Sequence, residues 1–183
     1  MRQTLVAAAF AILTLGSAAS AATINFDGTK PGDKFNYEEA GLIFDVTRIV
    51  NGNCDSASGK PCMALNNNEQ SILTKIGGGL FSLSSFWFQL LGNGTGNTLL
   101  VETDKGSLSL PVGTWGKNNG GNVIDLTSNT DFFDVAYVKF FTTNGGNVRV
   151  DDLTTPSAVP VPAAGLLLAG GLGLMAAVRR RRA

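Results

Sequence analysis

Acidic residues near the two ends of the expected folded domain are the side chains best suited to bind a cation. Asp27 ends the predicted first strand, and Asp151 and Asp152 belong to the predicted last one. Calcium prefers carboxylate and carbonyl oxygens as ligands. Because the terminal strands of many jelly rolls lie close together, these three residues could share a calcium site. The alternative is that they are solvated acids in turns.

Catalytic chemistry is not expected. The chain contains no histidine, which excludes a Ser-His-Asp triad, a Cys-His pair and the usual ligand sets of zinc hydrolases. Glycoside hydrolysis could use paired carboxylates, and Glu38–Glu39 and Asp151–Asp152 are adjacent pairs. Neighbours on a strand point to opposite faces, so neither pair is expected to form a dyad. A small hydrolase is therefore the least favoured function.

Three aromatic residues are candidates for stacking on sugar rings: Trp115, Trp87 and Tyr37. Trp115 lies in a loop rich in Gly and Asn. The apolar residues around Trp87 change phase, and a β-bulge at Ser84–Ser85 would place Trp87 on the face away from the core. Asn66 to Asn68 could supply amides to sugar hydroxyls. Each aromatic ring could equally belong to the core.

The two cysteines, Cys54 and Cys62, are expected to form a structural disulfide. A metal or redox role is the alternative. It is disfavoured because two thiols without histidine make poor zinc ligands, and the spacing is not that of a redox CxxC motif.

The elements that must position these residues are short strands. The segment 22–158 holds 18 Gly and 15 Asn, which separate runs rich in Val, Ile, Thr, Phe and Leu. Asn144 to Asn147 predicts a hairpin between strands 135–142 and 148–153. With roughly eight to ten strands in one domain, we expect an all-β fold: a two-sheet β-sandwich, jelly-roll-like.

The N-terminus has the three parts of a signal peptide. Arg2 supplies a positive charge, 5–15 is mostly apolar, and Ala19-Ser20-Ala21 is a cleavage sequence. Cleavage is expected between Ala21 and Ala22, so residues 1–21 are removed. A first transmembrane helix is disfavoured because the apolar run is too short.

The C-terminus predicts a stop-transfer segment. After a linker at 154–158, a proline motif leads into an uncharged run at 163–178 and then four arginines. A helix of that run would reach about 24 Å, and neighbouring residues could cover the rest of the hydrocarbon core. The arginines would remain on the cytoplasmic side. A plain single-span anchor is one interpretation.

The order of these parts, in 159–183, resembles the PEP-CTERM family of sorting tails, in the variant whose motif reads VPLPA. The matching residues are Val159, Pro160, Val161, Pro162 and Ala163, followed by Arg179, Arg180, Arg181 and Arg182. Val161 replaces the usual Leu, and the glutamate of the founding motif is absent. We expect export through the Sec machinery, and the resemblance implies processing by an exosortase from a membrane-anchored intermediate. The destination would be the cell surface or extracellular matrix of a Gram-negative bacterium.

The net charge of the domain at 22–153 limits the classes of ligand that it is expected to bind. Of the 14 basic residues in the chain, Arg2 and the four terminal arginines lie outside 22–158, which leaves 9 against 14 acidic residues. An acidic domain argues against nucleic-acid binding. The ends, Ile24 to Gly28 and Val148 to Leu153, resemble secreted β-sandwich modules, including carbohydrate-binding modules. We expect a non-enzymatic adhesive or structural module; a carbohydrate-binding module for exopolysaccharide is the alternative.

Overall fold

Apolar runs separated by Gly and Asn form antiparallel strands, as predicted. The computed structural model describes residues 21–92, 96–117, 120–143 and 145–156. Two short helical turns, α1 (Val112–Trp115) and a 3₁₀ turn (Thr130–Phe132), accompany the strands. The strands are β1 (Thr23–Ile24), β2 (Gly32–Glu39), β3 (Leu42–Val50), β4 (Cys62–Asn66), β5 (Gln70–Lys75), β6 (Ser85–Leu90), β7 (Thr98–Thr103), β8 (Ser107–Pro111), β9 (Asn122–Asp125), β10 (Tyr137–Thr143) and β11 (Asn147–Thr154).

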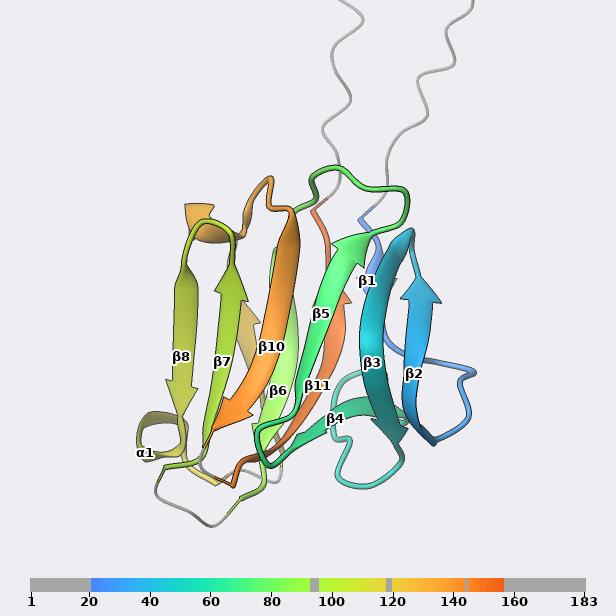
Figure 1. Cartoon of the computed structure of the whole chain (residues 1–183). Coiled ribbons are helices and arrows are strands. Elements are labelled where there is room, and N and C mark those ends of the chain that lie inside the picture. Colours follow the sequence, from blue (N-terminus) through green and yellow to red (C-terminus); the bar gives the residue numbers. More distant parts are fainter. Residues whose placement is uncertain (1–20, 93–95, 118–119, 144, 157–183) are drawn as a thin grey trace, which may run out of the picture. The chain divides into compact units, whose positions relative to one another are not determined.

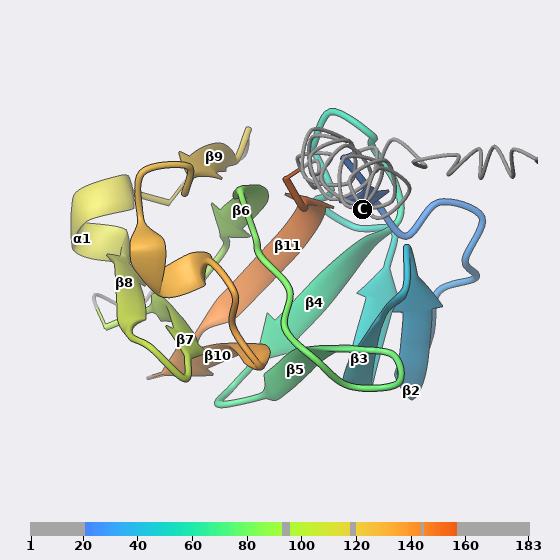
Figure 2. The same cartoon turned by 90° about the horizontal axis from the view of Figure 1, so that it is seen from above.

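The strands form two antiparallel layers of a β-sandwich, and both layers include part of β3 (Figures 1 and 2). One layer has the order β8-β7-β10-β5-β3-β2, and the other has the order β9-β6-β11-β4. The first half of β3 pairs with β5 and its second half pairs with β4, which closes the two layers along one side. β1 pairs with the end of β11, so the first and last strands lie side by side as expected.

The predicted hairpin at 144–147 is wrong. β10 pairs with β5 and β7, whereas β11 pairs with β4 and β6, so the two strands belong to different layers. The turn between β4 and β5 also crosses between layers, and Asn67 N donates to Gly146 O at 2.7 Å, which joins the two crossings. Turn residues specify a reversal of the chain; they do not specify which strands become hydrogen-bonded partners.

Aromatic rings fill the space between the layers. Phe44 and Phe140 come from one layer and Phe86 and Phe88 from the other, and all four are buried. Phe86 and Phe140 meet edge to face with ring centroids 5.5 Å apart. This geometry stabilises the fold by more than the buried apolar area alone. The core thus lies between the layers, and polar chemistry is left to the outer faces.

The apolar residues on both sides of Ser84 face the core, as predicted, but no β-bulge at Ser84–Ser85 produces this arrangement. Phe81, Leu83, Phe86 and Phe88 are all in the core. Leu83 N donates to Phe132 O, and Ser84 N donates to Thr154 O, so the chain changes partners just before β6 begins. The change is thus the start of a strand and not a bulge within one.

The two predicted targeting segments lie outside the described residues, except for Ala21. Residues 1–20 and 157–183, which include the sorting motif, the segment 163–178 and the terminal arginines, are not among the described residues. None of the helices in the described ranges is both long and apolar enough to cross a membrane.

Candidate functional site

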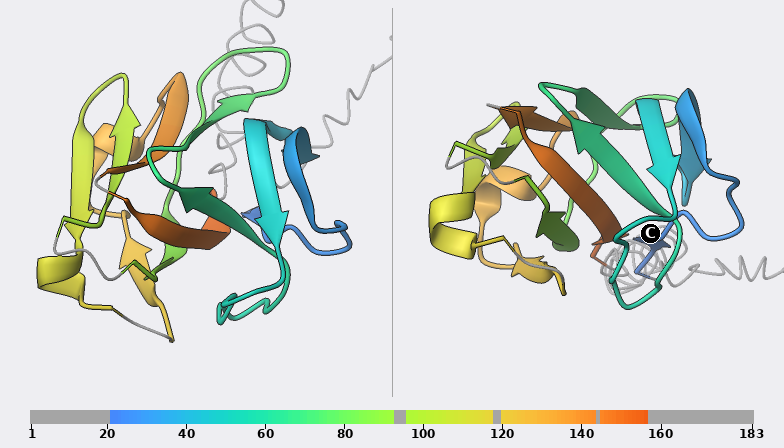
Figure 3. Two further views of the ribbon diagram at one scale, coloured as in Figure 1. Left: turned by 60° about the horizontal axis from the view of Figure 1, so that its bottom comes forward. Right: turned by 90° about the horizontal axis from the view of Figure 1, so that it is seen from below.

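A disulfide-closed loop covers the outer face of β11 and β6. Cys54 and Cys62 are bonded, with their Cα atoms 5.7 Å apart, as the sequence predicted. The loop before and within this ring contacts side chains that point away from the core: Gly52 O accepts from Arg149, and Asp55 accepts from Gln89 Nε2. Figure 3 shows this loop beside β4 and β11 from two sides. Its contacts make the outer face a partly enclosed polar environment.

Asp151 is fully buried beneath the loop. Its Oδ2 accepts from Ser56 Oγ at 2.6 Å and from Ser58 Oγ at 3.2 Å, and its Oδ1 accepts from Asp152 N at 2.9 Å. Burial raises the pKa of Asp151 from 3.8 to about 7, although these hydrogen bonds act against the rise. The carboxyl group is thus held by hydroxyls and a backbone amide, away from solvent.

Asp152 faces the same loop as Asp151. Its φ of 46° is left-handed, and the β11–β6 register shifts between Asp151 and Thr154. Asp152 Oδ2 therefore accepts from Ala57 N at 2.9 Å and from Ser58 N at 3.3 Å. The expectation that these neighbours point to opposite faces is wrong, because this irregularity breaks the alternation of a regular strand.

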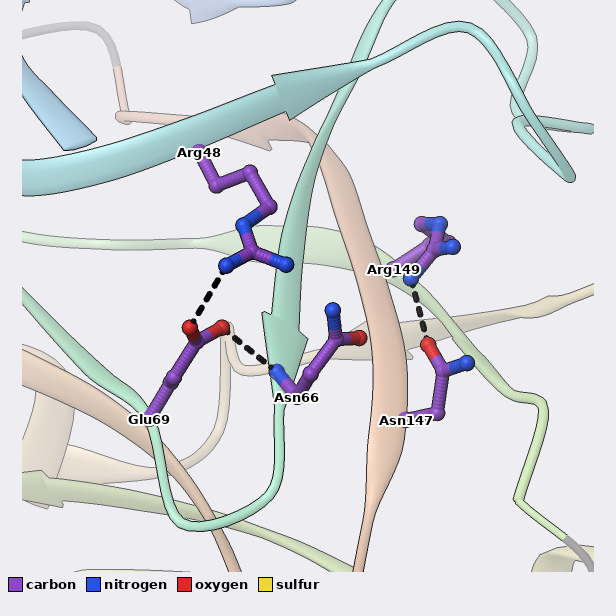
Figure 4. A network of polar contacts seen from close by, with 5 residues as sticks. All are labelled: Arg48, Asn66, Glu69, Asn147 and Arg149. Atoms are coloured by element: carbon purple, nitrogen blue, oxygen red, sulfur yellow. Dashed lines mark hydrogen bonds and ion pairs between the residues drawn. The ribbon is translucent and has the colours of Figure 1, made fainter. Parts of the chain in front are cut away.

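A second network joins β3, β4 and β11 beside the two turns that cross between the layers (Figure 4). Arg48 Nη2 pairs with Glu69 Oε1 at 2.9 Å, and Glu69 Oε2 accepts from Asn66 N at 2.8 Å. In the amide orientation that satisfies its neighbours, Asn66 accepts from Arg48 Nη1 and donates to Asn147 Oδ1. Arg149 Nη1 donates to the same Asn147 oxygen at 2.6 Å. The two arginines are thus linked through two amides.

Arg149 is the most enclosed cation of this network, with 8% of the residue exposed. Its Nε donates to Gly52 O at 3.0 Å, and its Nη1 also donates to Val148 O at 3.1 Å. Burial, and secondarily the charge of Arg48, lowers the pKa of Arg149. All of its hydrogen-bond acceptors within the described residues are neutral.

The three acids of the predicted calcium site are not gathered into one cluster. Asp27 is exposed and its Oδ2 accepts from Asn25 Nδ2 at 2.9 Å, whereas Asp151 and Asp152 engage the disulfide loop. Across the described ranges, no group of three acidic or thiol side chains is arranged to hold a metal. Pairing of β1 with β11 brings the strands together without bringing the side chains together.

The three aromatic candidates pack against the protein. Trp87 points away from the central core, as predicted, yet it is 3% exposed, because Gly121 lies against its indole ring. Trp115 is in α1 and meets the Phe88 ring edge to face at 5.5 Å. Tyr37 packs on Phe26 and donates to Glu39 at 2.9 Å, and its pKa rises to about 12, mainly through burial.

Sequence reasoning missed the arginine network. The alternation of Val148-Arg149-Val150-Asp151 places Arg149 and Asp151 on the face opposite the core valines, and this pattern could have identified them. No local pattern connects them to Arg48 and Glu69, which are about 80 to 100 residues earlier in the chain.

Ala22, the residue after the predicted signal-peptide cleavage position, lies inside the folded domain. Ala22 N donates to Thr155 Oγ1 at 3.3 Å, and Thr155 N donates to Ala22 O at 2.9 Å. The first and last described segments are therefore tied together.

Comparisons with known proteins assign no family. No protein-family model matches the chain, and no curated protein matches it. The chain is similar to a crystal structure of domains C and D (residues 230–489) of another protein, with 15% sequence identity and a TM-score of 0.42. The match covers 75% of this chain and 66% of that one, so the chain spans just under two thirds of that structure.

Proposed function

We propose that this protein is a non-enzymatic module of the bacterial cell surface or extracellular matrix, exported by its N-terminal signal and sorted by an exosortase through its C-terminal tail. The observation that carries the proposal is the Cys54–Cys62 disulfide, because such bonds persist in oxidising compartments outside the cytoplasm. We also propose that the chain follows a jelly-roll-like topology. This is supported by the β4–β5 and β10–β11 connections, which both cross from one layer to the other.

A structural or adhesive role is supported by the way the polar groups are used. Asp151, which has the most perturbed carboxyl group described, lies fully buried with both oxygens hydrogen-bonded inside the domain. A general acid or base must reach a substrate proton, and this group is enclosed by the disulfide loop. The ring of Trp87 is covered by Gly121 and that of Trp115 packs against Phe88, which does not favour recognition of neutral sugars by ring stacking.

The sorting proposal is tested by following the full chain and a variant lacking 159–183 in an exosortase-positive host and in a matched exosortase-deficient strain. We expect the full chain to reach the surface only in the first strain. Intact-mass analysis should show removal of residues 1–21, a change at the proline motif, and the loss of two hydrogens at the disulfide. Identical masses and locations in both strains would contradict exosortase sorting.

A further inference from the structure

Arg149 carries a positive charge that its surroundings do not compensate. It is more than nine-tenths buried, and its Nε and Nη1 donate to two backbone carbonyls and one amide oxygen. Removing a guanidinium from water is costly unless a charge of opposite sign accompanies it. No carboxylate pairs with Arg149 within the described part of the chain. The charge that acts on it is that of Arg48, which has the same sign.

The remaining donors of the network have no acceptor of their own. Arg149 Nη2 and Asn147 Nδ2 donate to no group within the described residues, although the other polar atoms of both side chains are engaged. Neither atom is fully enclosed by the protein, so both can be reached from solvent. An accessible cluster made of donors alone matches a ligand that supplies acceptors alone.

Arg48 adds a second cation at the rim. Its side chain is 27% exposed and that of Glu69 is 23% exposed, so this ion pair is open to a competing anion. Arg48, Asn66 and Arg149 follow one another across β3, β4 and β11 in Figure 4. Arg48 pairs with Glu69, whereas the charge of Arg149 has no carboxylate partner within the described residues and stays unbalanced. A bound anion would relieve the imbalance.

We propose that Arg149 and Asn147, with Arg48 at the rim, bind the carboxylate of an acidic sugar residue in an extracellular polysaccharide. Guanidinium groups bind carboxylates through paired, charge-assisted hydrogen bonds, and the neighbouring amide suits a sugar hydroxyl. The choice of a sugar rests on the proposed location in a polysaccharide matrix. The patch is small and the domain is acidic overall, so it selects single anionic groups and not the phosphate track of a nucleic acid.

The test uses the purified full chain in mild detergent, with oligogalacturonate as probe and a neutral maltooligosaccharide of equal length as its partner. Calorimetry should show binding of the acidic oligomer only, and the affinity should fall as salt is raised. Arg149→Gln should weaken binding roughly tenfold to a hundredfold, the range for hydrogen bonds to a charged group. Lys30→Gln removes the same charge at an exposed position between β1 and β2 and should leave binding unchanged.

A second variant separates binding from folding. Glu69→Gln removes the carboxylate that competes for Arg48, and it should tighten oligogalacturonate binding severalfold, an effect that a purely structural network does not predict. Equal binding of the neutral oligomer, no binding of the acidic one, or the same affinity after Arg149→Gln in a folded variant would overturn the proposal. Binding of polyglutamate without oligogalacturonate would overturn the sugar assignment. Because purified protein is used, these outcomes are independent of whether sorting occurs.

Discussion

Arg149 and Asp151 lie two residues apart on the outer face of β11, and each is bonded to the disulfide loop while no ion pair joins them within the described structure. Arg149 Nε donates to Gly52 O at 3.0 Å, whereas Asp151 Oδ2 accepts from Ser56 Oγ at 2.6 Å. A buried cation and a buried acid thus form separate hydrogen bonds with the same loop. The loop is therefore an integral part of this layer.

The first prediction concerns pH. The pKa of Asp151 is raised from 3.8 to about 7, so between about pH 4 and pH 7 the folded state retains a proton that the unfolded chain has lost. The free energy of unfolding therefore falls as pH rises through this window. The full shift corresponds to at most about 4 kcal/mol. Urea unfolding at pH 5 and pH 8 measures the fall.

Asp151→Asn should flatten this pH dependence, because an amide still accepts from the serines and cannot ionise. Asp125→Asn is the control: Asp125 is exposed and hydrogen bonds from Thr127 lower its pKa, so the fall due to Asp151 should persist. An unchanged slope in Asp151→Asn would show that this buried group does not titrate in the window.

The second prediction concerns the disulfide. Replacing both Cys54 and Cys62 by Ser should lower the free energy of unfolding by about 2.5 kcal/mol, the loop-entropy value for a ring of this size. Amide hydrogen exchange should also speed up at Ala57 and Ser58, whose N–H groups bond to Asp152. Reducing agent should reproduce the effect in the native chain and leave the double variant unaffected.

The third prediction concerns the packing over Trp87. A Cβ at Gly121 would lie 2.2 Å from the indole ring, and φ there is +69°. Gly121→Ala should therefore cost at least about 2 kcal/mol from overpacking and backbone strain. Gly113→Ala is the matched control, because nothing lies within 4 Å of its Cβ. Thermal unfolding should separate the two variants; equal midpoints would mean that the loop moves freely away from Trp87.

The fourth prediction concerns the left-handed residue of β11. Asp152→Ala removes the acceptor of two backbone N–H groups and keeps the unfavourable φ, so it should cost about 1–3 kcal/mol. Asp152→Asn should cost less, because Asn tolerates this conformation and keeps one oxygen acceptor. Denaturant unfolding of the pair would test the order, and a smaller loss for Ala would contradict it.

Much of the local structure could be predicted from the sequence. The runs rich in Val, Ile, Thr, Phe and Leu and the Gly and Asn turns between them indicated the strands, and the cysteine pair indicated its own bond. These features depend on residues close together in the chain, where periodicity and turn chemistry act directly. The same local logic failed at 144–147, where a correct turn connects strands of different layers.

The candidate site was decided at a longer range. Asp152 leaves the alternating pattern because β11 changes register, and Trp87 is covered because Gly121 reaches it from the loop before β9. The sequence by itself determined the all-β class, the inward and outward faces of β11 from Val148 to Asp151, and the disulfide. Only the tertiary structure placed Arg48, Glu69 and Asn147 around Arg149, because strand pairing brings together residues that no local pattern relates.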